Sequence, residues 1–575
     1  MHPSPASTFD VPLVAPTIPL LRESGIQIGS LHHLTMEVIG GKSGRVRLAE
    51  GEIMHVRVTL SAPSHLAKVR LWTNVGPAFP APAFHWEEMQ ADGDKHFHLA
   101  LPTYRPGGFY FTLQYTLDGH QWYWQRGDFW QVRVFPKQLK SLRLYTLIPT
   151  ASGPMTSWEK VLQEAADLNF NMIHILPLTR QGASQSPYAA ADLFALDPDL
   201  ISTGASSLDM SCFEKLVGHA QSLGLGLCLD LVLNHVAFDS DLAKRCPHWI
   251  QSDPLEEDGF KRAGFMTQEG FQKWNDLVLV HYNHPDIVTR LAIWDYMKHY
   301  AMFWASYAAA TQGMIRLDNL HSTHAGFAMH LTHELRQYFP QLGILGELFT
   351  THEETQQILE NYEIDLLLAT SWEHHFAQEL RHYFYYLHES MPHIPWFTPV
   401  NSHDSGVPAE EFADVRATVP RYILASLLGT GTTGHTQGVE SGILHKIEFI
   451  GRHPPLHLPS GHADFRGLIK KTNELLVRYT AFQQQGNLSF IDANHPAIMA
   501  GLRRPRDVQK PTAIVIVNLD IHQNQSLELD LQALGLGSTP LWDAFTEQPM
   551  ARHGSLLRCE LGPCDFLVLL AGEMA

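Results

Sequence analysis

The chain has 575 residues, and its 41 Lys and Arg against 59 Asp and Glu give a formal charge of −18 with histidine counted as neutral. This balance argues against nucleic-acid binding, which needs a basic face, and no Lys/Arg cluster is longer than the one at residues 137–140. The content of 45% hydrophobic and 17% charged residues is typical of a globular protein, and no apolar run of about 18 residues predicts a membrane span.

The amino terminus and the cysteines indicate the cellular setting. Residues 1–23 contain no basic segment followed by an apolar one, so we expect no secretory signal and a cytoplasmic location. The five cysteines include no CxxC pair, which argues against both a disulfide framework and a thiolate metal site. Paired histidines such as His330 and His333 lack the carboxylate and cysteine neighbours of a metal site. We therefore expect neither a metal nor a cofactor.

The first part of the chain predicts an all-β unit. Residues 1–28 are rich in Pro and Ser and are expected to form an arm, whereas residues 29–138 contain strand-length segments separated by Gly, Pro and Asp turns. Such segments are typical of a β-sandwich. Five tryptophans in this unit are candidates for binding polysaccharide, although aromatic residues that alternate along strands more often pack in a core. They are Trp72, Trp86, Trp122, Trp124 and Trp130.

From about residue 139 the pattern alternates between strands and amphipathic helices, which indicates parallel strands with helical crossovers. Eight candidate strands predict an α/β fold, a (β/α)₈ barrel over residues 139–485. They are centred on residues 142–148, 172–176, 227–231, 314–318, 344–347, 365–369, 397–400 and 426–433. The long third connection predicts an insertion after strand 3, at about 237–290. A β pattern returns at 486–575 and predicts a C-terminal β-sandwich.

Four carboxylates stand directly after apolar strands of the predicted barrel: Asp230, Asp318, Glu347 and Asp404. One such residue alone is consistent with an ordinary surface position. Four of them on four strands favour an active site, because the loops at the carboxyl ends of barrel strands hold the site in nearly every barrel enzyme.

Two carboxylates that face one cleft can divide the roles of nucleophile and general acid, as cleavage of a glycosidic bond requires. Arg316 lies two residues before Asp318 on the same strand, so their side chains share one side. We expect this guanidinium to keep Asp318 ionised, which is compatible with a structural salt bridge. His235 and His403 are placed to donate hydrogen bonds to sugar hydroxyls.

The strings around these four carboxylates, in this order, resemble the four conserved regions of the α-amylase superfamily of retaining α-glucan enzymes. The resemblance implies that Asp318 is the nucleophile, Glu347 the general acid/base and Asp404 the stabiliser of the transition state. It also implies a central sugar subsite formed by Asp230, Asn234, His235, Arg316 and His403.

Residues 316–323, 346–350 and 171–178 are more closely similar to the glucanotransferase half of the eukaryotic-type glycogen debranching enzyme. This similarity extends over about residues 140–440. It implies that Tyr188 is an aromatic platform under the sugar, the alternative being an aromatic at the rim, and that His321 reaches toward the acceptor. Trp274, Trp372 and Trp396 lie in or beside predicted loops and are candidates for acceptor subsites or for packing.

Two features depart from the debranching enzyme. About 90 residues follow the predicted barrel, too few for the helical amylo-1,6-glucosidase domain, so we expect the chain to lack that activity and regard a separate α-1,6-glucosidase as a candidate partner. Ser402 stands where relatives usually carry Asn or Thr, which affects the detail of the subsite. By analogy with some amylases, a calcium ion near Asn234 is compatible with the sequence, but no residue pattern indicates it.

The sequence therefore predicts a 4-α-glucanotransferase that acts on α-1,4-glucans such as maltooligosaccharides, glycogen or starch branches. Within the same fold, the alternatives are an α-amylase-type hydrolase and a maltosyltransferase with a phosphorylated donor, which would need a local basic pocket. Outside enzymes, the alternative is a glucan-binding scaffold with an inactive barrel. The intact set Asp318, Glu347 and Asp404 argues against that scaffold.

Overall fold

The structure is a computed structural model that describes residues 27–28, 34–42, 44–76, 83–127, 129–202, 204–267, 270–390, 394–451, 461–493, 495–552 and 554–572. The chain divides into two compact units, Met1–Tyr104 with Gly108–Val134 and Arg105–Gly107 with Phe135–Ala575. The predicted arm at residues 1–28 lies outside the described residues except for strand β1 (Gln27–Ile28), which pairs in parallel with β10. None of the helices in the described ranges is both long and apolar enough to cross a bilayer.

The first unit consists of two sheets around one core. One sheet has the order β1-β10-β9-β11-β3 with β5 and β6 attached, and the other has the order β2-β4-β8-β7. Apolar residues alternate with polar ones along β4, so Met54, Val56 and Val58 are buried against Phe109 and Phe111 of the other sheet. The strands are β2 (Leu34–Val38), β3 (Arg45–Ala49), β4 (Ile53–Leu60), β5 (Lys68–Thr73), β6 (His85–Glu88), β7 (Gln90–Asp92), β8 (His96–Pro102), β9 (Gly107–Thr116), β10 (Trp122–Trp124) and β11 (Trp130–Phe135).

The tryptophans of this unit pack mainly on one another and on other side chains of the same unit. The Trp86 ring stacks on Trp124 with centroids 5.6 Å apart, and the Arg70 guanidinium lies 4.0 Å from the Trp86 ring and 4.1 Å from that of Trp122. Trp72 lies 4.6 Å from Trp86, and Trp130 stacks on Phe111 at 5.9 Å. Because these ring faces are largely engaged within the protein, packing explains them, and glucan binding by this unit stays a prediction.

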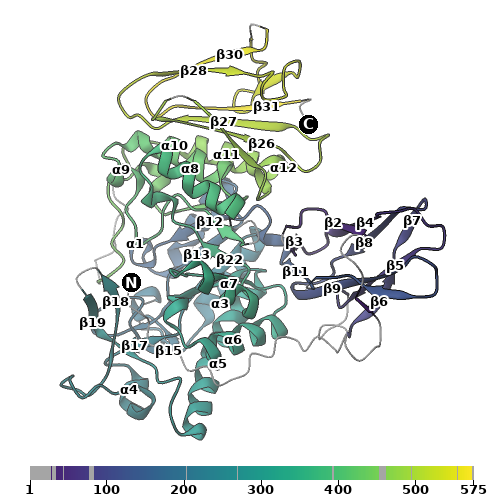
Figure 1. The fold of residues 1–575 in the computed structure, drawn as a ribbon. Coiled ribbons are helices and arrows are strands. Elements are labelled where there is room, and N and C mark those ends of the chain that lie inside the picture. Colours follow the sequence, from purple (N-terminus) through teal and green to yellow (C-terminus); the bar gives the residue numbers. More distant parts are fainter. Residues whose placement is uncertain are drawn as a thin grey trace. The chain divides into compact units, whose positions relative to one another are not determined.

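Eight parallel strands form the barrel in the order β23-β22-β21-β20-β16-β13-β12-β24 (Figure 1). The Val400 amide donates to the Gly434 carbonyl at 2.8 Å and so links the segment after β23 to β24. All seven residues of β16 are buried, as expected for strands covered on both faces. The strands are β12 (Arg143–Leu147), β13 (Met172–Ile175), β16 (Gly226–Val232), β20 (Met314–Asp318), β21 (Gly343–Gly346), β22 (Leu366–Leu368), β23 (Trp396–Phe397) and β24 (Thr433–Thr436).

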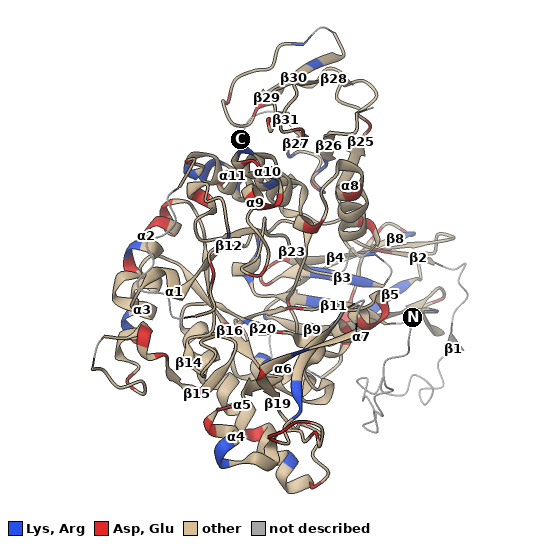
Figure 2. Cartoon of the chain, turned by 90° about the vertical axis from the view of Figure 1, so that its left-hand side faces the viewer, with Lys and Arg blue, Asp and Glu red and all other residues tan. Residues whose placement is uncertain are grey.

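Helices connect these strands and cover the barrel (Figure 1). They include α2 (Glu159–Asp167), α3 (Ser211–Ser222), α5 (Ile287–Ala310), α6 (Ala325–Tyr338), α7 (His352–Asn361), α8 (Ala377–Tyr385), α10 (Thr418–Ile423) and α11 (Arg466–Arg478). Helices α2 and α3 each carry both basic and acidic residues, as Figure 2 shows. The predicted position of the last strand, near 426–433, is wrong, because Leu424–Leu428 is helical and the strand starts at Thr433. A short apolar run fits a buried helix as well as a strand.

Two long connections carry structure of their own. Strands β14 (Thr179–Gln181) and β15 (Ala190–Leu196) lie between β13 and α3 and form a two-stranded sheet. Between β16 and α5, β17 (His235–Ala237), β18 (Arg262–Thr267) and β19 (Gly270–Leu279) form a second small sheet in the order β17-β19-β18, accompanied by helix α4 (Asp241–Arg245).

After the barrel, two more sheets follow. One has the order β25-β26-β27-β31-β29, and β28 pairs with β30 in the other. The fully buried Arg503 ties the larger sheet to the barrel, since its guanidinium donates to the carbonyls of Ala481 and Leu427, both at 3.2 Å. Burial lowers the pKa of Arg503 to about 9. The strands are β25 (Leu488–Ile491), β26 (Ile498–Arg503), β27 (Thr512–Asn518), β28 (Gln525–Asp530), β29 (Leu541–Asp543), β30 (Leu556–Leu561) and β31 (Phe566–Ala571).

Candidate active site

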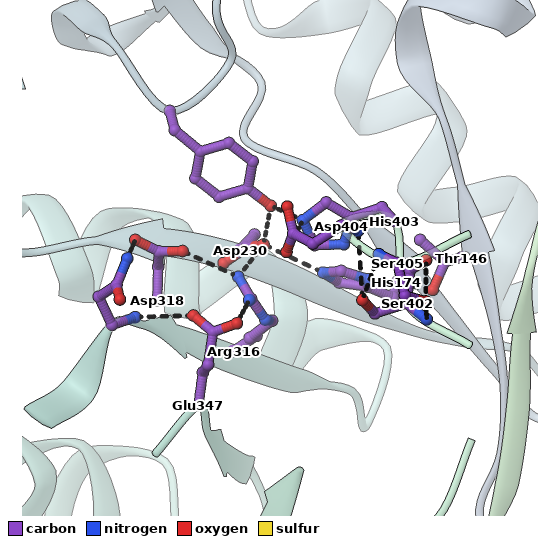
Figure 3. A network of polar contacts seen from close by, with 12 residues as sticks. Thr146, His174, Asp230, Arg316, Asp318, Glu347, Ser402, His403, Asp404 and Ser405 are labelled. Carbon is purple, nitrogen blue, oxygen red and sulfur yellow. Dashed lines mark hydrogen bonds and ion pairs between the residues drawn. The ribbon is translucent and has the colours of Figure 1, made fainter. Parts of the chain in front are cut away.

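The predicted strand-end carboxylates gather at one end of the barrel (Figure 3). Asp230 lies on β16 and pairs in register with Arg316 on β20, which ends at Asp318. Glu347 directly follows β21, and Asp404 lies in the loop after β23. Because all these strands are parallel, their carboxyl ends meet at the same edge of the barrel, which is why residues far apart in the sequence share one site.

Arg316 is the centre of this cluster. Its guanidinium lies 2.7 Å from Asp230 Oδ2 and 3.2 Å from Asp318 Oδ1 through Nη1, and 2.6 Å from Glu347 Oε1 through Nη2. The side chains of Arg316 and these three carboxylates are all less than one tenth exposed. Burial opposes the charge of Arg316, but its carboxylate neighbours raise its pKa well above the ordinary value, so it stays cationic.

The pKa values of Asp230 and Asp318, the two carboxyls that Arg316 contacts through Nη1, are shifted in opposite directions. Burial disfavours ionised Asp230, yet Arg316 and His174 hold its pKa well below the ordinary value. Burial and the charge of Glu347 raise the pKa of Asp318 well above its ordinary value, and Arg316 offsets this only in part. Arg316 thus lowers the pKa of Asp318, as expected from the sequence, but it offsets burial and Glu347 only in part, because its single guanidinium is shared among three carboxyls.

Asn319 contacts both central carboxyls, and the sequence did not single it out. Its backbone amide donates to Glu347 Oε2 at 3.0 Å, and its Nδ2 donates to Asp318 Oδ2 at 3.3 Å. The residue has left-handed backbone angles, φ 43° and ψ 49°. Asn tolerates this conformation better than most residues, so an Asn directly after the strand was the available signal.

Tyr188 and His403 form the wall of the site beside Asp230. The Tyr188 hydroxyl donates to Asp230 Oδ2 at 2.8 Å and lies 2.6 Å from His403 Nε2. The two rings are nearly parallel, with centroids 5.5 Å apart and an interplanar angle of 5°. Burial lowers the pKa of His403 to about 3, so this imidazole is neutral at physiological pH. His403 Nε2 also lies 3.2 Å from Asp404 Oδ2, whose side chain is 55% exposed.

His174 and Thr146 belong to the same network, although the sequence analysis missed both. His174 Nε2 lies 3.2 Å from Asp230 Oδ2, and its Nδ1 lies 3.2 Å from Thr146 Oγ1. Both side chains come from neighbouring barrel strands, β13 and β12. A polar His174 between two isoleucines in a buried strand was the signal that could have identified it.

Asn234 and His235 are buried neighbours in the chain, and His235 contacts the backbone of Tyr188. His235 Nε2 is 3.1 Å from the Tyr188 carbonyl, so its ring supports the Tyr188 backbone, and burial lowers its pKa to about 4. A direct bond from His235 to a sugar stays a prediction. Asn234 is buried, and its Oδ1 has no hydrogen-bond partner in the described part of the chain. Nowhere in the described ranges do three or more His, Cys, Asp or Glu side chains form a group suited to a metal ion.

The aromatic residues predicted for acceptor subsites have different surroundings. Trp396 is only 8% exposed and packs in the barrel core 5.9 Å from Tyr386, so packing, one of the two roles considered for it, accounts for this residue. Trp372 is half-buried against an apolar cluster whose members include the strand residues Leu366 and Leu368. Trp274 lies on β19 and its ring is 6.3 Å from that of His235, so it remains beside the site.

His321 follows β20 at the mouth of the site. Its side chain is exposed, and its ring lies 6.1 Å from that of Phe349, which is 52% exposed. Its backbone lies near Glu347, because the neighbouring Leu320 amide donates to the Glu347 carbonyl at 3.0 Å. Both rings are therefore accessible next to one of the central carboxyls.

Comparison with known proteins places this geometry in a family context. Residues 137–254 match the family model described as glycogen debranching enzyme, glucanotransferase domain. The resemblance inferred from the sequence is confirmed. An α-1,4-glucan:maltose-1-phosphate maltosyltransferase from Arcanobacterium haemolyticum is 24% identical over 71% of this chain and 61% of its own length. The glycogen debranching enzyme of Saccharomyces cerevisiae is 24% identical over 42% of this chain.

The chain spans about three fifths of that maltosyltransferase and 17% of that debranching enzyme. Among solved structures, a maltogenic α-amylase from Thermotoga neapolitana is 17% identical with a TM-score of 0.60, over 76% of this chain and 100% of its own. A cyclomaltodextrinase, also 17% identical with a TM-score of 0.60, covers 91% of this chain and 97% of its own. At this identity the likeness shows the fold, a (β/α)₈ barrel of the α-amylase type.

Proposed function

We propose that the chain is a 4-α-glucanotransferase that acts on α-1,4-glucans by a retaining double displacement. The observation that carries the proposal is the buried cluster in which Arg316 contacts Asp230, Asp318 and Glu347 at the carboxyl edge of the barrel. The match to a glucanotransferase domain supports the same reaction class. An uncharged glucan also suits a chain with a formal charge of −18.

In the first step, an Asp318 oxygen attacks the anomeric carbon while Glu347 gives its proton to the departing glycosidic oxygen. In the second step, the 4-hydroxyl of another glucan attacks the same carbon, Glu347 takes its proton, and the ester to Asp318 breaks. The first step needs Glu347 protonated and Asp318 ionised, whereas the second needs Glu347 ionised so that it can take the proton of the acceptor hydroxyl. Arg316 and Asn319 both donate to Asp318, at 3.2 and 3.3 Å, and so favour the ionised carboxylate that attacks.

Asp230 and its partners are inferred to bind the sugar next to the bond that breaks. The ionised Asp230 accepts from Tyr188, Arg316 and His174, so its position is fixed before substrate arrives. Asp404 is more exposed and is inferred to contact sugar hydroxyls as positive charge develops at the anomeric carbon. Tyr188 places its ring beside Asp230, where a pyranose face can pack.

Purified protein incubated with maltotriose tests the reaction. A ladder of longer and shorter oligosaccharides without new reducing ends supports transfer. Accumulating reducing ends would favour an α-amylase-type hydrolase instead, since water would then be the acceptor. An inactive protein that still sediments with glycogen would favour a scaffold with an inactive barrel. If transfer is found, a separate α-1,6-glucosidase is the inferred partner for removing branch points.

A maltosyltransferase with a phosphorylated donor is the second candidate. Several relatives carry this name, among them proteins from Arcanobacterium haemolyticum and Salinibacter ruber. Lys446 supplies a cation at the mouth of the site, since its Nζ donates to the Asp404 carbonyl at 3.3 Å. Maltose 1-phosphate offered together with glycogen distinguishes the two candidates. Release of inorganic phosphate, with no ladder from maltotriose alone, would replace the glucanotransferase proposal.

A further inference from the structure

The hairpin of β18 and β19 carries aromatic side chains on both of its faces. Phe265 pairs with Gln272 across the hairpin, whereas Met266 pairs with Phe271, so Phe265 and Phe271 point to opposite sides. Phe265 is 49% exposed and Phe271 is 55% exposed. On the second face, Phe271 packs over Gly264, where a Cβ atom would lie 2.7 Å from the Phe271 ring. The hairpin therefore offers two matched exposed phenylalanines.

Ring contacts lead from the face with Phe265 toward the candidate active site. The Phe265 and Trp274 rings are 5.4 Å apart at an angle of 32°, and Trp274 in turn lies 6.3 Å from His235. Trp274 packs on small residues of the neighbouring strands, including Ala237 and Ala263, which leaves its ring half-buried. A shift in strand register between Arg262 and Gly264 accompanies this placement.

His235 connects this face to the central carboxylates. Its Nε2 lies 3.1 Å from the Tyr188 carbonyl, and the Tyr188 hydroxyl donates to Asp230 at 2.8 Å. Phe265 and Trp274 thus continue along the hairpin the row of rings that starts with Tyr188 and His235. Exposed aromatic groups of this kind mark ligand-binding surfaces, because leaving them in water is unfavourable and a ligand with an apolar face relieves that cost.

We propose that Phe265 and Trp274 form an outer subsite that stacks on glucose units of an α-1,4-glucan away from the bond that is cleaved. This inference rests on the proposed function, because it takes the glucan as the ligand of the neighbouring site. The C–H face of a pyranose packs on an aromatic ring. Because Phe265 and Trp274 are uncharged, a glucan that stacks on them does not have to displace water from a charged group. The subsite favours long chains, since short ones end before they reach it.

Binding measurements in an Asp318→Asn background test the proposal without turnover. Maltoheptaose and maltotriose are titrated against this parent and against variants that add Phe265→Ala, Trp274→Ala or Trp274→Phe. We expect Phe265→Ala and Trp274→Ala to weaken maltoheptaose binding by about 3- to 10-fold, the loss of one aromatic contact, and to leave maltotriose unchanged. Trp274→Phe should recover part of the loss because it keeps an aromatic face.

Phe271→Ala is the matched control, because it removes the same side chain from the other face of the same hairpin. It should leave the binding of both sugars unchanged. Equal binding of maltoheptaose by the parent and Phe265→Ala would overturn the inference, as would an equal loss with Phe271→Ala. If the protein with native Asp318 converts no glucan, but Phe265→Ala and Trp274→Ala still weaken the binding of maltoheptaose and not of maltotriose, the proposed reaction fails and the subsite stands.

Discussion

Asn319 offers a sharp test of how the two central carboxyls are held. Its backbone amide and its side chain contact Glu347 and Asp318, respectively, and both contacts depend on the left-handed backbone at this position. Asn319→Gly keeps that backbone and the amide donor but removes Nδ2. Asn319→Ala also removes Nδ2 and in addition places a Cβ atom in a conformation that disfavours it.

The expected sizes follow from the geometry. A hydrogen bond to an ionised group contributes about 1.5–3 kcal/mol, and the 3.3 Å separation of Nδ2 from Asp318 favours the lower end. Its loss corresponds to roughly a tenfold decrease in kcat/KM. The left-handed conformation costs Ala about 1 kcal/mol more than Gly, so Asn319→Ala should also be less stable to urea by about that amount.

Kinetics of both variants over a range of pH provide the assay. Removing a donor to ionised Asp318 raises the pKa of this carboxyl further, so the acidic limb of kcat/KM should move to higher pH in both variants. Unchanged kcat/KM and an unchanged acidic limb in Asn319→Gly would refute the reasoning. An Asn319→Ala variant as stable as Asn319→Gly would refute the part that concerns the backbone.

Further predictions concern the carboxyls and two buried charges. Asp318→Asn and Glu347→Gln should each lower turnover by about three orders of magnitude or more, with the thermal unfolding midpoint unchanged or raised; near-normal turnover in either variant would contradict the assigned roles. Glu440 accepts hydrogen bonds from Tyr145 and the Gly438 amide, and burial raises its pKa to about 7 from 4.5. The stabilisation that Glu440 contributes is fully present below pH 4.5. It decreases by about 3 kcal/mol as the pH rises through 7. Relative to the parent, Glu440→Gln should therefore gain stability to urea between pH 4.5 and 8, and a constant difference would contradict this. Arg503→Met should cost about 3 kcal/mol or more of unfolding free energy in urea, since its carbonyl partners lose their donor, and an unchanged value would show that these bonds are replaceable.

Much of the barrel could be predicted from the sequence. Strands buried on both faces produce short, continuous apolar runs such as the one in β16, and those runs stand out between amphipathic helices. The position of Asp318 and Glu347 directly after such runs was equally visible. The last strand was misplaced because residues 423–428 are apolar without a period that separates helix from strand.

The sequence by itself determined which residues could meet, because the carboxyl ends of parallel strands must share one edge of the barrel. Only the tertiary structure decided how they meet. It showed that burial and the charge of Glu347 raise the pKa of Asp318, and that the Arg316 guanidinium, shared by three carboxyls, offsets this only in part. It also brought His174 to Asp230 and aligned Phe265 with Trp274 and His235. These contacts depend on strand register and on side-chain packing between distant segments, which no local pattern encodes.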